Sequence, residues 1–121
     1  MRLRGAKTLV TGGSRGIGKA IARQLVHCGA EVAVVARGES ELQQVATEIG
    51  ATAITADLTD PAAIDHIVAE STVALGHVDL LVNNAALVRP TAVPDMADTD
   101  LQGEMQCNLL APMRLGRVSR I

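Results

Sequence analysis

The stretch Val10-Thr11-Gly12-Gly13-Ser14-Arg15-Gly16-Ile17-Gly18-Lys19 decides the fold prediction for this chain of 121 residues. It follows a short apolar run and precedes a segment with helical periodicity. Backbone N–H groups at a helix start are unpaired and carry partial positive charge, so they bind phosphate oxygens. Glycines let the backbone approach such a phosphate closely. The spacing Gly12-x-x-x-Gly16-x-Gly18 therefore predicts a phosphate-binding turn, with an ordinary tight strand-to-helix turn as the alternative.

A second phosphate-binding pattern overlaps this turn. The segment from Gly13 to Lys19 matches G-x-x-x-x-G-K, the pattern of a P-loop. A P-loop continues with Ser or Thr, whose hydroxyl binds magnesium, and Ala20 stands there instead. This substitution argues against a nucleotide triphosphatase.

Short apolar runs alternate with helical patterns through the first two thirds of the chain. We predict strands over Ala6–Thr11, Glu31–Ala36, Ala51–Ala56 and Val78–Asn83, because each run is short and nearly continuously apolar. Apolar stripes at helical spacing separate them, and these are Ile17, Ala20, Ile21, Leu25 and Cys28, then Leu42, Val45, Ala46 and Ile49, then Ile64, Ile67, Val68 and Leu75. This alternation predicts one α/β domain over residues 1–121, with a doubly wound parallel sheet and right-handed crossovers.

Signals for helix ends support the same division of the chain. Asp60 followed by Pro61 predicts an N-cap with proline at the first helical position. Gly29, Gly50 and Gly76 each follow a helical stripe, where a left-handed C-cap is expected.

The last third of the chain has a looser pattern. Pro90 and Pro94 predict a loop, followed by a short helix over Asp95–Asp100. A final helix is expected from Leu101 to the C-terminus, with Pro112 bending it. Its apolar face would carry Met105, Leu109 and Met113.

The composition excludes several functions. Hydrophobic residues make up 48% of the chain, yet it contains no Phe, Tyr or Trp. Without aromatic rings there is no platform on which bases could stack, and no tyrosine can act as an acid or base. The net charge of −2 also argues against a general nucleic-acid or membrane-surface binder.

Cysteine and histidine positions predict neither disulfides nor a metal site. Cys28 and Cys107 lie far apart, and three scattered histidines add no ligand spacing. No apolar run approaches the length of a membrane span. We therefore expect a reduced, cytoplasmic protein.

Four landmarks in this order resemble the short-chain dehydrogenase/reductase family. Thr11 to Gly18 is similar to the family's cofactor turn, and Asp57-Leu58 resembles its adenine-contacting acid and the residue after it. Asn83-Asn84-Ala85-Ala86 resembles the Asn-Asn-Ala-Gly motif, with Ala86 in place of glycine, and Asn108 resembles the asparagine of the proton relay. Other roles stay open, since Asp57 can cap a turn and the asparagines can satisfy backbone groups.

The resemblance implies a Rossmann-like sheet of four strands in the order 3-2-1-4 with flanking helices. It implies NAD(P)-dependent hydride transfer between carbonyl and alcohol groups. The family's catalytic Ser, Tyr and Lys follow a fifth strand, and the chain resembles only the N-terminal, cofactor-binding half, truncated before that strand. We therefore expect it to be inactive alone, with Asn108 left without its relay partners. The alternatives are a non-catalytic nucleotide-binding module, or a folded remnant or designed minimal domain.

The end of the second predicted strand favours NADP(H) over NAD(H). NAD sites place an acid there to bind the ribose 2′-hydroxyl, whereas NADP sites place arginine near the 2′-phosphate. Here Arg37 follows the strand directly, and Arg15 lies within the glycine turn. Two guanidinium groups favour a phosphate dianion. The candidate cofactor-binding residues are Gly12, Ser14, Arg15, Gly16, Ile17, Gly18, Arg37, Asp57, Leu58, Asn84, Ala85 and Ala86.

Self-association is a further expectation. In the family order the strand over Val78–Asn83 lies at a sheet edge, with unpaired backbone groups. The outer face of the final helix would also be uncovered. We therefore expect a homo-oligomer formed through one or both of these surfaces.

Overall fold

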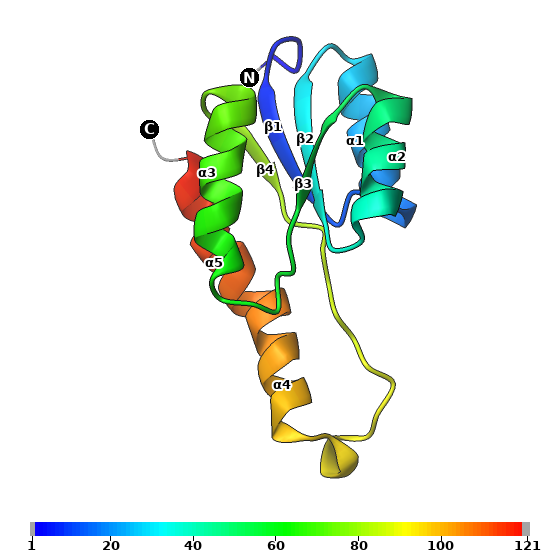
Figure 1. Ribbon diagram of the computed structural model, residues 1–121, viewed down its shortest axis with the longest axis vertical. Helices are drawn as coiled ribbons and strands as arrows, with labels where there is room; N and C mark the ends of the chain where they lie inside the picture. Colours follow the sequence, from blue (N-terminus) through cyan, green and yellow to red (C-terminus); the bar gives the residue numbers. More distant parts are fainter. Residues whose placement is uncertain (1, 120–121) are drawn as a thin grey trace.

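A four-stranded parallel sheet forms the centre of the computed structural model, which describes residues 2–119. The strands are β1 (Lys7–Thr11), β2 (Glu31–Ala36), β3 (Thr52–Thr55) and β4 (Leu80–Val82), in the spatial order β3-β2-β1-β4 (Figure 1). In the register of the sheet, Val10 lies opposite both Val34 and Val82. The predicted fold class and strand order are confirmed. Three of the strands are one to three residues shorter than the predicted apolar runs.

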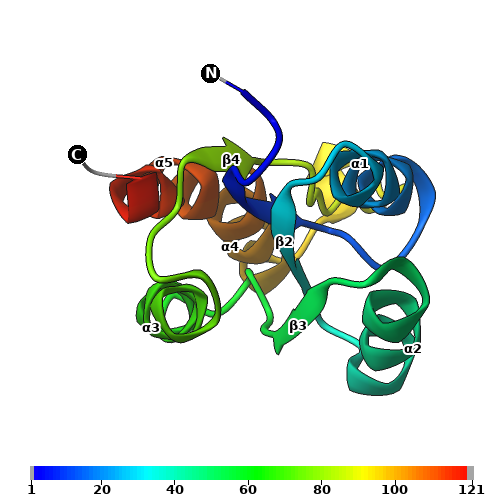
Figure 2. The same cartoon turned by 90° about the horizontal axis from the view of Figure 1, so that it is seen from above.

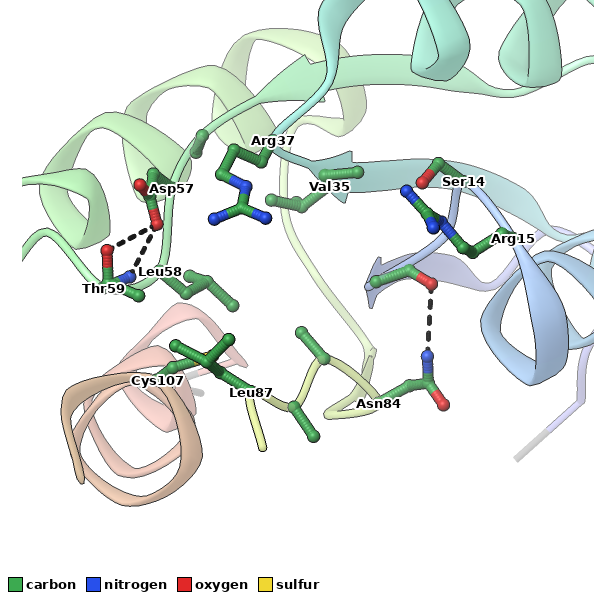
Figure 3. A pocket seen from close by; sticks show the side chains of 15 residues that line it. Ser14, Arg15, Val35, Arg37, Asp57, Leu58, Thr59, Asn84, Leu87 and Cys107 are labelled. Carbon is green, nitrogen blue, oxygen red and sulfur yellow. Dashed lines mark hydrogen bonds between the residues drawn. The ribbon is translucent and has the colours of Figure 1, made fainter. Parts of the chain in front are cut away.

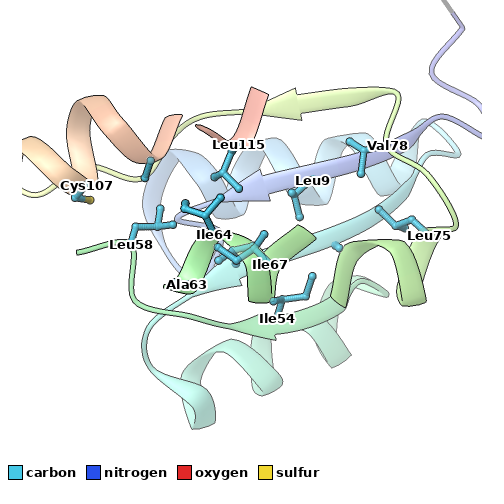
Figure 4. Packing of buried hydrophobic residues seen from close by; sticks show 13 residues of the cluster. Leu9, Ile54, Leu58, Ala63, Ile64, Ile67, Leu75, Val78, Cys107 and Leu115 are labelled. Carbon is cyan, nitrogen blue, oxygen red and sulfur yellow. The ribbon is translucent and has the colours of Figure 1, made fainter. Parts of the chain in front are cut away.

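Helices cover both faces of this sheet. Figure 2 shows α1 (Gly16–His27) and α2 (Glu39–Ile49) on one face, with α3 (Ala63–Leu75) on the other. Successive side chains of a strand point to opposite faces. Accordingly Val10 belongs to the aliphatic core under α1 and α2, while Leu9 belongs to the core under α3. Figure 4 shows this second core, in which Leu9, Ile67 and Leu115 are fully buried.

The buried face of α1 differs from the prediction. Ile17, Ala20 and Cys28 are exposed, and the residues buried against the sheet are Gly18, Ala22 and Leu25. The reason is a direct approach of backbone to backbone, because a Cβ on Gly18 would overlap the carbonyl oxygen of Gly12. A stripe of apolar residues in the sequence does not reveal the buried face of a helix when the closest contact of that face is made by a glycine.

The predicted helix ends are confirmed at the glycines and shifted at Asp60. Gly29, Gly50 and Gly76 all have positive φ, of 91°, 79° and 84°; Gly50 has the left-handed helical conformation, whereas Gly76, with ψ of −47°, does not. Helix α3 begins only at Ala63. Asp60 instead accepts the N–H of Ala62 at 2.9 Å, so its side chain caps the turn that leads into the helix.

After β4 the chain forms five short helical elements. They are the 3₁₀ turn η1 (Val93–Asp95), α4 (Asp98–Met105), the π-helical turn η2 (Gln106–Leu110), α5 (Ala111–Leu115) and the 3₁₀ turn η3 (Gly116–Ser119). The short helix predicted over Asp95–Asp100 is therefore wrong, since η1 ends where that helix was expected to begin. Figure 1 shows α4 standing beyond the carboxyl ends of the strands.

The wide turn η2 precedes Pro112, which lacks an N–H. The N–H of Ala111 donates to the carbonyl of Gln106, five residues earlier, and this widening accommodates the missing donor. Met105, Leu109 and Met113 are all exposed, whereas Cys107 and Leu115 face the core. Within residues 2–119 no helix has the length and apolar character that crossing a bilayer requires.

Candidate cofactor site

A cavity of about 450 Å³ opens at the carboxyl ends of the strands (Figure 3). Its position follows from the strand order. From the end of β1 the chain crosses over to form β2 on one side of β1, while β4 pairs with β1 on the other side. In open α/β sheets, ligands bind at such a switch point. The cavity is lined by Gly12, Ser14, Arg15, Val35, Ala36, Arg37, Ala56, Asp57, Leu58, Thr59, Asn84, Ala85, Ala86, Leu87 and Cys107.

The glycine turn gives one wall of this cavity its shape. Gly12 has φ of 68°, and a Cβ there would come within 2.9 Å of Ala85 Cα and of Asn84 Nδ2. Gly16 also has a positive φ, 58°, but the described residues leave open space around the position of its Cβ. Glycine is therefore needed at the first position for space and conformation, and at the second for conformation alone.

The N-terminus of α1 fits an anionic group. Its N-cap residue, Arg15, makes no side-chain capping hydrogen bond, and the first turn contains no acidic residue. The partial positive charge of the helix start is thus left uncompensated by side chains of the first turn. A phosphate would be stabilised there.

A hydrogen-bonded clasp joins the glycine turn to the segment after β4. The hydroxyl of Thr11, a residue only 1% exposed, accepts the N–H groups of Asn84 and Ala85, each at 3.1 Å. In return, Asn84 Nδ2 donates to the carbonyl of Gly12 at 3.1 Å. These contacts fix the two segments against each other along one wall of the cavity.

Asp57 lies on the opposite side of the cavity, beside Thr59 (Figure 3). The hydroxyl and the N–H of Thr59 donate to Asp57 Oδ1 at 2.7 and 2.9 Å. These hydrogen bonds hold the pKa of the Asp57 carboxyl below its ordinary value, the charge of Arg37 acts in the same direction, and partial burial opposes both. At neutral pH the site therefore contains an ionised carboxylate.

Cys107 contributes an apolar part of the wall. Burial raises the pKa of its thiol, and the negative charge of Asp57 adds to this effect. The thiol consequently stays protonated and acts as a small apolar group beside Leu58 and Leu87.

Two arginines reach the cavity from different elements. Figure 3 shows Arg37 beside Asp57 and Arg15 on the far side, next to Ser14. Arg37 has no ion pair among the described residues, whereas Arg15 Nε lies 3.3 Å from Glu41 Oε1. The carboxyl end of β2 itself carries no acid.

The structure brings most of the predicted cofactor residues together. Those lining the cavity are Gly12, Ser14, Arg15, Arg37, Asp57, Leu58, Asn84, Ala85 and Ala86. Gly16 lines an adjacent hollow between α1 and α2, and Gly18 packs against Gly12. The Ile17 side chain is 73% exposed and does not line the cavity.

Sequence reasoning missed six lining residues, which are Val35, Ala36, Ala56, Thr59, Leu87 and Cys107. For Thr59 a signal was present, since a hydroxyl two residues after an aspartate is placed to bond its carboxylate. For Cys107 no such signal was present, because it reaches the cavity from η2, 50 residues after Asp57 in the chain.

Asn108 holds the segment after β4 instead of facing the cavity. Its Nδ2 donates to the Leu87 carbonyl and its Oδ1 accepts the Leu87 N–H, both at 2.7 Å. Four residues earlier on the same helical face, Glu104 accepts the N–H of Arg89 at 2.8 Å. The two contacts fasten this loop along α4 and η2.

The fold is that of the short chain dehydrogenases. The short chain dehydrogenase family model matches residues 6–118, and the chain belongs to that family. It is 36% identical to the 3-oxoacyl-(acyl-carrier-protein) reductase FabG of Escherichia coli (strain K12), over 97% of this chain and 49% of the relative. It is 48% identical to a sorbitol dehydrogenase of Cereibacter sphaeroides, over 72% of this chain and 35% of the relative.

Solved structures agree with these sequence relatives. A short chain dehydrogenase from Burkholderia cenocepacia J2315, in complex with NADP, superposes with a TM-score of 0.89 at 37% identity. The match covers 98% of this chain and 51% of that one. A metagenomic short-chain oxidoreductase in complex with NADP gives the same TM-score at 35% identity. The chain spans about half the length of the curated relatives that it matches.

Proposed function

We propose that this chain is the NADP(H)-binding domain of an oxidoreductase that interconverts carbonyl and alcohol groups. One observation carries the choice of cofactor: two arginines flank a cavity in which the end of β2 supplies no acid. A 2′-phosphate dianion would be attracted by Arg15 and Arg37, whereas an acid at this place would repel it. The nicotinamide cofactor, when bound, supplies or accepts the hydride.

The chain's own groups are suited to the rest of such a molecule. The uncapped start of α1 and the glycine turn would receive the pyrophosphate. Asp57 Oδ1 is engaged by Thr59, so Oδ2 is the oxygen left to accept a hydrogen bond from the adenine. Leu58, Leu87 and Cys107 would contact the apolar faces of the base.

We further propose that the 121-residue chain binds the cofactor without turning it over. It contains no tyrosine, and its only lysines are Lys7 and Lys19. Lys7 pairs with Glu31 at the start of β1, away from the cavity, and Lys19 Nζ lies 3.4 Å from Glu48. Neither lysine lines the cavity. Incubation with NADPH and a panel of ketones is expected to show no oxidation above background.

Calorimetric titration at low salt tests the cofactor assignment. NADPH is expected to bind more tightly than NADH, and Arg37→Gln is expected to remove most of the difference. Arg117→Gln, an exposed arginine of η3, serves as the matched control. Equal or tighter binding of NADH by the unaltered chain would contradict the assignment.

A non-catalytic nucleotide-binding module is the second candidate function. The Asn108 side chain favours it, because both of its polar atoms are bonded to the Leu87 backbone. A longer reading frame that adds a Tyr-x-x-x-Lys motif and restores ketone reduction would decide for the enzyme.

We also propose that the chain associates with itself. Within residues 2–119, β4 pairs only with β1, so its other edge is open. Apolar side chains are exposed along α4, η2 and α5, namely Leu101, Met105, Leu109, Leu110 and Met113. Covering them would remove apolar surface from water. Light scattering is expected to give a dimer or larger species, and a monodisperse monomer at high concentration would contradict this.

A further inference from the structure

The two arginines of the cavity differ in their surroundings. Arg37 lies beside Asp57 but makes no ion pair among the described residues, whereas Arg15 forms an ion pair with Glu41 in the first turn of α2. Arg15 belongs to two hollows at once, because it lines the cofactor cavity and also the groove between α1 and α2 that Glu41 lines. Its guanidinium thus stands between an internal carboxylate and the cavity.

The geometry of this contact leaves part of the guanidinium available. Glu41 Oε1 faces Nε, one edge of the planar fork, at 3.3 Å. One Nη N–H shares that edge, and the other three Nη donors point along the remaining edges, where they are able to bind a second anion. That anion would then share one cation with Glu41, and two negative groups so placed repel each other.

We propose that Glu41 is a specificity-determining residue that competes with the cofactor's 2′-phosphate for Arg15. This inference rests on the proposed NADP(H) binding. The carboxylate weakens the binding of NADPH and leaves NADH unaffected, because NADH has no phosphate at this position. Glu41 therefore reduces the preference for NADPH over NADH that Arg15 and Arg37 create.

Other acids of α2 do not have this relation to the site. Glu48 is occupied by Lys19 and by Arg23, whose Nη2 lies 2.9 Å from Glu48 Oε1. Glu39 carries the same charge in the same helical turn as Glu41, yet it lines neither hollow. Glu39→Gln is consequently a matched control for a general loss of negative charge.

Calorimetric titrations of NADPH and NADH with Glu41→Gln test the proposal. The Arg15 and Glu41 side chains are 83% and 49% exposed, so the pair is worth little in water. We expect NADPH to bind about two- to fivefold more tightly to the variant, the range that an exposed ion pair can supply. The affinity for NADH is expected to stay unchanged, and Glu39→Gln is expected to alter neither.

Repeating the substitution in an Arg15→Gln background separates competition for Arg15 from a diffuse field effect. The gain from Glu41→Gln should vanish there. Weaker NADPH binding by Glu41→Gln, an equal gain from Glu39→Gln, or a gain that persists without Arg15 would each overturn the proposal.

The same titrations distinguish a failure of the proposed role of Glu41 from a failure of the proposed NADP(H) binding. The unaltered chain could bind NADPH more tightly than NADH while Glu41→Gln leaves the NADPH affinity unchanged. That result would contradict the role of Glu41 alone. Binding of neither dinucleotide by a chain that melts cooperatively would overturn the proposed function, and the role of Glu41 with it.

Discussion

Thr59 donates twice to one oxygen of Asp57, from its hydroxyl at 2.7 Å and from its N–H at 2.9 Å. A carboxylate bound in this way is fixed in direction, because rotation about its own bonds would break both contacts. The direction of its second oxygen, Oδ2, is thereby fixed before any ligand contacts it. The arrangement prepares one hydrogen-bond acceptor in the cavity before a cofactor arrives.

Removal of the Thr59 hydroxyl is expected to change stability in a pH-dependent way. The pKa of Asp57 is lower in the folded chain, so its contribution is present at neutral pH and is lost as the pH falls through the folded value. We expect Thr59→Val to lower the free energy of unfolding by about 1 kcal/mol at pH 7. The difference should shrink as the pH falls below the ordinary carboxyl value of 3.8.

Urea unfolding at several pH values measures this effect. Thr91→Val provides the control, because Thr91 is exposed and its backbone N–H, not its hydroxyl, donates to the Arg89 carbonyl. A constant difference between pH 7 and pH 3 would show that Thr59 does not act through Asp57.

Thr11→Val is expected to be among the more damaging substitutions of similar size. It leaves the N–H groups of Asn84 and Ala85 without their acceptor, and each unsatisfied donor costs about 1–3 kcal/mol. We expect a loss of about 3 kcal/mol in urea unfolding and weaker binding of the dinucleotide.

A threonine on the same strand provides the comparison for Thr11. Thr8 is also fully buried in β1, but its hydroxyl makes only a long contact, 3.5 Å, to the Ala6 carbonyl. Thr8→Val should therefore cost less than about 1 kcal/mol. Equal losses of unfolding free energy for the two valine variants would contradict the role of the Thr11 hydroxyl as the acceptor that holds Asn84 and Ala85.

The glycines near the cavity are expected to respond to alanine for different reasons. Gly18→Ala places a methyl group against the Gly12 carbonyl, and we expect a loss of about 3 kcal/mol, at the upper end for overpacking. Gly16→Ala meets no neighbour but must adopt a φ of 58°, which costs about 1–2 kcal/mol.

Gly38 supplies the reference for these two alanine variants. It has neither a positive φ nor a close neighbour, so Gly38→Ala should change stability by less than about 0.5 kcal/mol. Chemical denaturation gives the three values. A larger loss at Gly38 than at Gly18 would contradict the backbone approach.

Asn108→Ala should loosen the segment after β4 more than it destabilises the whole chain. The two lost hydrogen bonds lie at an exposed residue, so we expect a global cost of about 1 kcal/mol. Amide exchange at Leu87, whose N–H donates to Asn108, is expected to accelerate about tenfold or more. Gln102→Ala, on exposed α4, is the control, and unchanged exchange at Leu87 would contradict the assignment.

Local signals predicted the arrangement of this fold and much of the site. Apolar runs, left-handed glycines and the glycine turn each depend on a few neighbouring residues, and the sheet with its strand order follows once they are placed in sequence. The failures have separate causes. The face of α1 was misjudged because backbone contact replaced a side chain at Gly18, and the boundary predicted between Asp100 and Leu101 falls inside α4, which runs from Asp98 to Met105.

Contacts between distant segments could not be predicted from spacing. Glu41 meets Arg15 from another helix, and Asn108 meets Leu87 across a loop. Such pairs depend on how helices pack against the sheet, which apolar periodicity determines only to within a turn or so. The cavity was therefore predictable in its glycines and charges, and unpredictable in the contacts that orient them.

The open edge of β4 has a consequence for cofactor binding. That strand continues into Asn84 and Ala85, which Thr11 fastens to the glycine turn. A strand that paired with β4 from outside would therefore restrain one wall of the cavity. Linkage is reciprocal: to the extent that such pairing tightened dinucleotide binding, the dinucleotide would strengthen the pairing by the same factor. The affinity for a small molecule would then report on how completely this sheet is built.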